Sequence, residues 1–166
     1  GWGPGLIGVS LACYGLGVAF VQGLIIRLHY VRNIQPQKIV IFSLVVGSLT
    51  LFGFGSIKTA WLVFALIPIA VLTELMNPTL DGFISNKVSD DTQGLLQGIL
   101  SSINAITTIL SPLLMTLLFK IGASQKDDWY IPGLPFYFAA ILLVICIIPI
   151  LRVMNTLEHA KKRKIK

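Results

Sequence analysis

In this chain of 166 residues, 55% are hydrophobic and 12% are charged, against roughly 25% charged residues in a soluble domain. A soluble domain of this size could not bury so much apolar surface. The net charge of +6 does not indicate a nucleic-acid partner, because 5 of the 13 Lys and Arg residues occupy the last six positions and most others lie between apolar runs. That distribution is typical of membrane orientation signals.

Five apolar segments are each long enough for a membrane-spanning helix, which needs about 20 residues to cross roughly 30 Å of hydrocarbon. The predicted spans are Leu6–Ile26, Ile39–Ile57, Trp61–Ile84, Leu95–Phe119 and Pro135–Val153. They predict an all-α membrane protein with a transmembrane domain over residues 1–156, followed by a basic cytoplasmic tail over residues 157–166.

The first predicted span carries a row of small residues at helical spacing, formed by Gly8, Ala12, Gly15 and Ala19. Such a row is typical of a face that packs closely on another helix. Gln22 continues the row near the end of the span. Its amide is a candidate for lining a polar path, and the alternative is a hydrogen bond to a neighbouring helix.

The third predicted span contains an acidic residue, Glu74, deep within the membrane-length segment. Asn77, Asp81 and Ser85 follow on the same helical face, and Pro78 predicts a kink because it removes a backbone donor. An ionisable group at this depth normally faces a cavity or a partner. Glu74 is therefore a candidate for proton coupling and Asn77 for lining the path; the alternative is a protonated Glu74 with a purely structural hydrogen bond.

The fourth predicted span is two-sided. One side is apolar, whereas a polar stripe consists of Gln97, Ser101, Asn104, Thr108 and Ser111. A helix that only anchors a protein in the membrane does not need such a stripe. The stripe therefore indicates a polar interior, most simply that of a transporter. We take Gln97 and Asn104 as further candidates for lining the path. Beside the stripe, Gly94 and Gly98 would allow close approach of another helix, and Pro112 would shape the span.

Basic residues predict the orientation, because they concentrate on the cytoplasmic side of membrane proteins. With five spans, ten of the 13 fall on one side: Arg27, Arg32, Lys38, Lys87, Arg152, Lys161, Lys162, Arg163, Lys164 and Lys166. The remaining three, Lys58, Lys120 and Lys126, fall on the other. The prediction is an N-terminus outside and a C-terminus in the cytoplasm.

Catalytic and metal-binding constellations are not indicated. The chain has two cysteines, Cys13 and Cys146, each inside an apolar run, and two histidines, His29 and His159. These cannot supply a disulfide framework or enough convergent ligands for a metal. We expect neither an enzyme nor a cofactor or metal.

Several motifs resemble tetracycline-efflux proteins of the major facilitator superfamily. The similar stretches are Gly1-Trp2, Ile7 to Ala12 with Gly15 and Gln22, Pro78-Thr79-Leu80, Ile84-Ser85, Val88 to Gly98, and Ser111-Pro112-Leu113. Arg32 matches the arginine of the family's cytoplasmic loop motif, in a longer loop that ends at Lys38. Two positions depart from the pattern: Gly47 stands about where tetracycline exporters carry an aspartate, and Glu74 where the family tends to have a small residue.

The resemblance implies that the five spans are helices eight to twelve of a twelve-helix carrier, and that the chain is a piece of a longer protein. It also implies proton-coupled export of drug-like small molecules across a bacterial inner membrane, through a cavity shared with the missing N-terminal half. The expected partners are the lipid bilayer, a small-molecule substrate, protons and that half. The alternative is a non-transporting membrane remnant, or an accessory scaffold from a split carrier gene.

Overall fold

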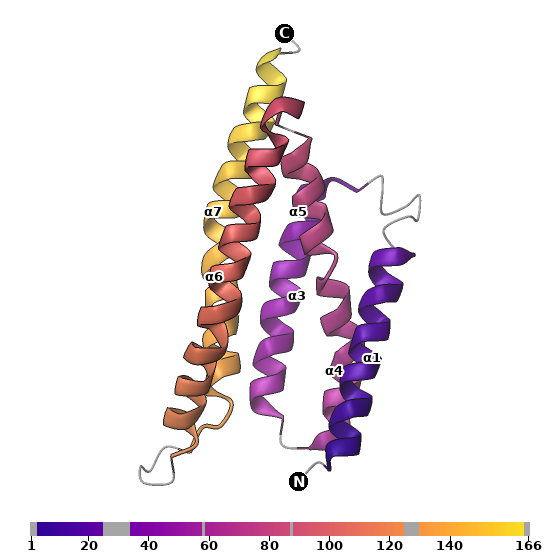
Figure 1. Cartoon of the computed structure of the whole chain (residues 1–166), viewed down its shortest axis with the longest axis vertical. Helices are drawn as coiled ribbons and strands as arrows, with labels where there is room; N and C mark the ends of the chain where they lie inside the picture. Colours follow the sequence, from indigo (N-terminus) through magenta and orange to yellow (C-terminus); the bar gives the residue numbers. More distant parts are fainter. Residues whose placement is uncertain (1–2, 25–33, 58, 87, 125–129, 165–166) are drawn as a thin grey trace.

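The computed structural model describes residues 3–24, 34–57, 59–86, 88–124 and 130–164. Its helices run up and down beside one another along one long axis (Figure 1). They are α1 (Pro4–Gly23), α3 (Pro36–Ser56), α4 (Ala60–Thr73), α5 (Met76–Ser85), α6 (Asp90–Gly122) and α7 (Leu134–Lys164). The chain is thus all-helical in the part that the structure describes.

Within the described residues, five helical segments are long and apolar enough to cross a membrane: Pro4–Gly23, Pro36–Ser56, Trp61–Ser85, Asp91–Gly122 and Leu134–Val153. This confirms the prediction of an all-α protein with five membrane-length segments, and the bounds differ from those predicted by only a few residues. The third segment consists of α4 and α5, which a short break separates. Beyond Val153, α7 continues as helix to Lys164, so most of the predicted tail extends the last helix.

α3 lies at the centre of the bundle. It packs against α7 on one side and against α4 and α5 on the other; α1 packs on α4, and α6 packs on α7 (Figure 1). A small apolar core joins α1 to the α4–α5 segment and consists of Val21, Ile67, Val71 and Leu75. In α3, Val40 and Leu44 are each only 2% exposed.

Most of the apolar surface remains uncovered. The exposed large side chains include Leu16 at 73%, Leu95 at 67% and Leu113 at 66%. A soluble protein rarely exposes continuous apolar surface on this scale, whereas lipid or further helices can cover it. The exposure is therefore consistent with helices that lie in a bilayer.

Glycines allow close helix approach at positions other than those predicted. A Cβ at Gly17 would lie 2.8 Å from Val71 Cγ2, and one at Gly55 would lie 2.9 Å from the ring of Tyr137. A Cβ at Gly8 or Gly15 would meet nothing within 4 Å. The small-residue row of the first span is therefore not the face on which α1 meets α4, because α1 is rotated so that Gly17 and Val21 point inward.

We expect Gly17→Val to destabilise the protein by about 1–3 kcal/mol, because the new methyl groups would collide with Val71 and force α1 from α4. Gly15→Val is the matched control on the same helix, where the space is open. Thermal unfolding in detergent, followed by circular dichroism, measures both. Equal unfolding temperatures for the two variants would contradict the packing of Gly17 on α4.

Candidate functional site

Glu74 lies at the break between α4 and α5. It follows Thr73, the last residue of α4, and α5 begins at Met76. The backbone N–H of Glu74 donates to Val71 O (3.1 Å), and that of Leu75 donates to Leu72 O (3.4 Å). Both bonds span three residues instead of the four of a regular α-helix, so the chain tightens here.

Pro78 explains the position of this break. In a continuous helix the N–H of residue 78 would donate to the carbonyl of Glu74, but proline has no N–H and its ring crowds the carbonyl four residues earlier. Regular bonding resumes at Thr79, whose N–H donates to Leu75 O (3.3 Å) and whose hydroxyl donates to the same oxygen (2.6 Å). The predicted kink at Pro78 is thus a break centred on Glu74 and Leu75.

The Glu74 carboxyl group has a partner at each oxygen. The hydroxyl of Tyr14, on α1, donates to Oε1 at 2.6 Å, and Asn77 Nδ2 donates to Oε2 at a longer 3.4 Å. Glu74 and Tyr14 are both half-buried, whereas Asn77 is exposed. Two different elements, α1 and α5, thus donate hydrogen bonds to the Glu74 carboxyl group, and a protonated carboxyl group would have different hydrogen bonding because it can itself donate.

The structure brings Glu74 together with one of the four residues predicted to line a path, Asn77. Gln22, Gln97 and Asn104 are exposed and lie on other helices. Gln22 is on α1, which packs on α4, whereas Gln97 and Asn104 are on α6, which packs on α7 beyond α3 (Figure 1). The role of these three residues as path-lining groups stays a prediction.

The polar stripe of α6 faces no other helix among the described residues. A Cβ at Gly94 or Gly98 would meet nothing within 4 Å, so their predicted use for close approach also stays a prediction. α6 remains a single helix through Pro112. In the predicted cytoplasmic loop motif, Lys38 is exposed in the first turn of α3, and Arg32 lies outside the described residues.

Tyr14 is the residue of this site that the sequence reasoning missed. Its ring packs on the core cluster between α1 and α4 while its hydroxyl reaches Glu74. A tyrosine buried among apolar residues usually has a hydrogen-bond partner. That rule could have marked Tyr14 as one end of a polar contact, although it could not have named Glu74 as the other.

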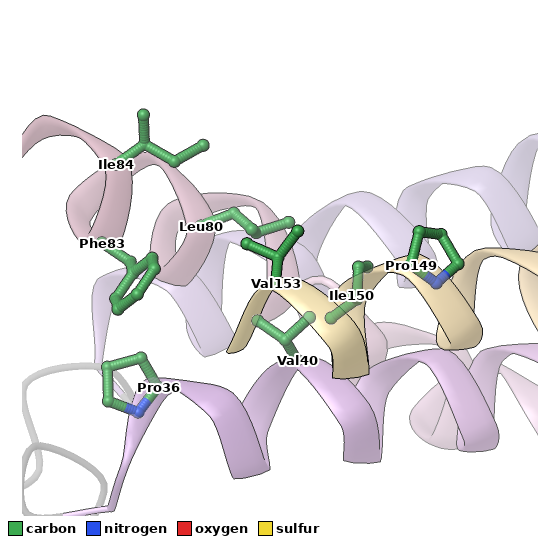
Figure 2. Close-up of a pocket in the computed structure, with 8 residues that line it drawn as sticks. All are labelled: Pro36, Val40, Leu80, Phe83, Ile84, Pro149, Ile150 and Val153. Atoms are coloured by element: carbon green, nitrogen blue, oxygen red, sulfur yellow. The ribbon is translucent and has the colours of Figure 1, made fainter. Parts of the chain in front are cut away.

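A separate cavity of about 220 Å³ lies between α3, α5 and α7, and Figure 2 shows the side chains that surround it. Its lining is entirely apolar and consists of Pro36, Val40, Leu80, Phe83, Ile84, Pro149, Ile150 and Val153. It offers no polar group that could orient a ligand. Among the described residues there is also no group of three or more His, Cys, Asp or Glu side chains that could hold a metal ion.

Apolar helices of membrane length, with a hydrogen-bonded carboxyl group between two of them, define a polytopic membrane protein. The chain belongs to the Major Facilitator Superfamily, whose family profile matches residues 1–166.

Its relatives include tetracycline resistance proteins from Escherichia coli. The class E protein is 28% identical over 86% of this chain and 35% of its own length. The class B protein is 31% identical over 86% of the chain and 36% of its own length. A mouse relative, hippocampus abundant transcript-like protein 1, is 26% identical over 87% of the chain and 31% of its own length. The chain thus spans about a third of these relatives, and no solved structure matches it significantly.

Proposed function

We propose that the chain is the C-terminal part of a secondary active exporter of drug-like small molecules, and that protons drive it through Glu74. The observation that carries this proposal is the carboxyl group at the α4–α5 break, held by Tyr14 and Asn77 within membrane-length segments. Membership in the superfamily supports transport as the function. The relatives named tetracycline resistance proteins support export as the direction of transport and drug-like molecules as the substrate class. The five segments would be helices eight to twelve of a twelve-helix carrier in a bacterial inner membrane.

The remaining part of the carrier would cover what this chain leaves open. The α6 face with Gln97 and Asn104 is exposed, and an uncovered polar stripe is costly in lipid. Carriers of this type place their substrate path between two halves. An N-terminal half packed on this side would turn the stripe into one wall of that path.

Transport itself tests the proposal. Everted membrane vesicles that hold the intact carrier should accumulate tetracycline, or the aromatic cation ethidium, in a saturable manner that a protonophore abolishes, because eversion turns export into uptake by the vesicle. Vesicles that hold only residues 1–166 should show no such transport, because one wall does not enclose a path. Saturable, protonophore-sensitive transport by the 166 residues alone would contradict the proposed division between two halves.

We also propose that the N-terminus faces outward and the C-terminus faces the cytoplasm. Lys38 lies at the start of α3, and Arg152 lies near the end of the membrane-length part of α7, where Val153 and Pro36 of α3 line the same cavity. Lys120 lies in the last turn of α6, at the other end of the bundle. The positive-inside rule assigns the first of these ends to the cytoplasm.

Cysteine labelling in intact cells tests this orientation. In a Cys13→Ala, Cys146→Ala background, single cysteines at Gln35, Lys87 and Lys162 should be protected from an impermeant thiol reagent. Cysteines at Lys58 and Lys126 should react. The reverse pattern at even two of these five positions would overturn the orientation.

A further inference from the structure

The contact between Tyr14 and Glu74 adds a polar connection to the apolar core that joins α1 to the α4–α5 segment. Among the described residues, side-chain hydrogen bonds join separate membrane-length segments at two places: Tyr14 to Glu74, and Ser56 to Tyr137. α1 packs on α4, and Val21 is the one buried residue described on α1. Among the described residues, Tyr14 thus supplies the side-chain hydrogen bond that joins α1 to the α4–α5 segment, beside the apolar contacts of Gly17 and Val21.

The strength of that hydrogen bond depends on the charge of Glu74. An ionised carboxylate only accepts hydrogen bonds, so the Tyr14 hydroxyl must donate to it, and a charge-assisted bond of this kind is roughly twice as strong as a neutral one. A protonated carboxyl group can itself donate a hydrogen bond to another acceptor. Its remaining hydrogen bond with Tyr14 then joins two neutral groups. Proton uptake by Glu74 thus weakens the connection between α1 and α4.

We propose that Tyr14 is a positioning residue that holds α1 against α4 while Glu74 is ionised and releases α1 when Glu74 takes up a proton. This inference rests on the proposed role of Glu74 as the proton site. α1 is then the element that moves when Glu74 gains or loses a proton. The change in hydrogen bonding occurs at the α4–α5 break, where Pro78 has already interrupted the backbone hydrogen bonds.

Few other titratable groups could produce the same response. The elements at the site contribute Cys13, next to Tyr14 on α1, Lys38 on α3 and Asp81 on α5. Cys13 and Asp81 are exposed, and Lys38 lines a cavity that Leu75 also lines. Lys38 is thus the one cation described on α3, and the experiment includes Lys38→Gln to separate its influence from that of Tyr14.

Distance measurements between spin labels test the proposal without a known substrate. One label replaces Leu16 on α1 and the other replaces Ala65 on α4, both exposed positions, in the intact carrier with Cys13→Ala and Cys146→Ala. Without further substitutions, the distance distribution should be narrow at alkaline pH and become broader and longer at acidic pH. Tyr14→Phe keeps the ring but removes the hydroxyl, so this pH dependence should be lost.

Three further variants identify the cause. Glu74→Gln should also abolish the pH dependence, whereas Lys38→Gln should keep it. Tyr137→Phe, the matched control, removes the tyrosine hydroxyl that lies 3.0 Å from Ser56 Oγ with no carboxyl group involved, and it should keep the pH dependence too. A carrier whose distances do not respond to pH, or a Tyr14→Phe variant that responds like its parent, would overturn the proposal.

Transport assays separate this inference from the proposed function. Tyr14→Phe should lower export driven by a pH gradient about tenfold, as expected for the loss of one hydrogen bond to a charged group. If Glu74→Gln abolishes such export while Tyr14→Phe leaves it unchanged, the proposed function stands and the role of Tyr14 is wrong. If Glu74→Gln exports normally, the proposed function falls, whatever the distances show.

Discussion

In membrane vesicles that hold the intact carrier, Glu74→Gln is expected to lower export driven by a pH gradient to the level of vesicles without carrier. Glutamine has nearly the shape of glutamate and can still accept the hydrogen bond from Tyr14, but it cannot exchange a proton. Substrate exchange in the absence of a pH gradient should survive, because it needs no proton. Glu74→Asp should retain part of the coupled transport.

The control for this substitution is Glu158→Gln, which changes the only other glutamate of the chain, in the predicted tail. It should export like the unmodified carrier. Western blots of the vesicles establish that both variants reach the membrane. Normal export by Glu74→Gln, with an unchanged pH profile, would make Glu74 a structural residue and move the proton site to another part of the carrier.

Pro78→Ala should have the second large effect, and it should act on stability and transport in opposite directions. Alanine restores the N–H that can bond the Glu74 carbonyl, so α4 and α5 should join into one continuous helix. Removal of proline from a helix interior favours the folded state by about 1–3 kcal/mol. The straightened helix would turn Glu74 away from Tyr14, and we expect coupled export to fall about tenfold.

Amide hydrogen exchange and thermal unfolding measure the first effect, and vesicle transport measures the second. Pro149→Ala is the control, because Pro149 lies inside α7, which stays helical through it. That control should gain stability and keep its transport activity. A Pro78→Ala carrier that gains stability and transports at the normal rate would show that the break is not needed for function.

The membrane-length segments could be predicted from the sequence because length and hydropathy decide whether a helix can span a bilayer. The break near Glu74 could be predicted for a similarly local reason, since Pro78 acts on the carbonyl four residues before it. These features depend on residues that are close together in the chain. Their physical causes are therefore visible in a single segment.

The partner of Glu74 could not be predicted, because it depends on how two helices sixty residues apart are rotated and aligned. The small-residue row of the first span illustrates the difficulty. A helical projection shows that Gly8 and Gly15 share a face, but it does not say whether another helix covers that face, and α4 instead meets α1 at Gly17. The polar stripe of α6 poses the same problem, because its proposed partner belongs to another part of the carrier.

The most direct test of a proton-coupled carrier is the proton that it releases. Tetracycline or ethidium would be added to the purified intact carrier in weakly buffered solution, and the pH would be recorded with an indicator dye. The unmodified carrier should release protons when the compound binds, and Glu74→Gln should release none. Equal proton release from the two proteins would contradict the assignment of Glu74 as the proton site.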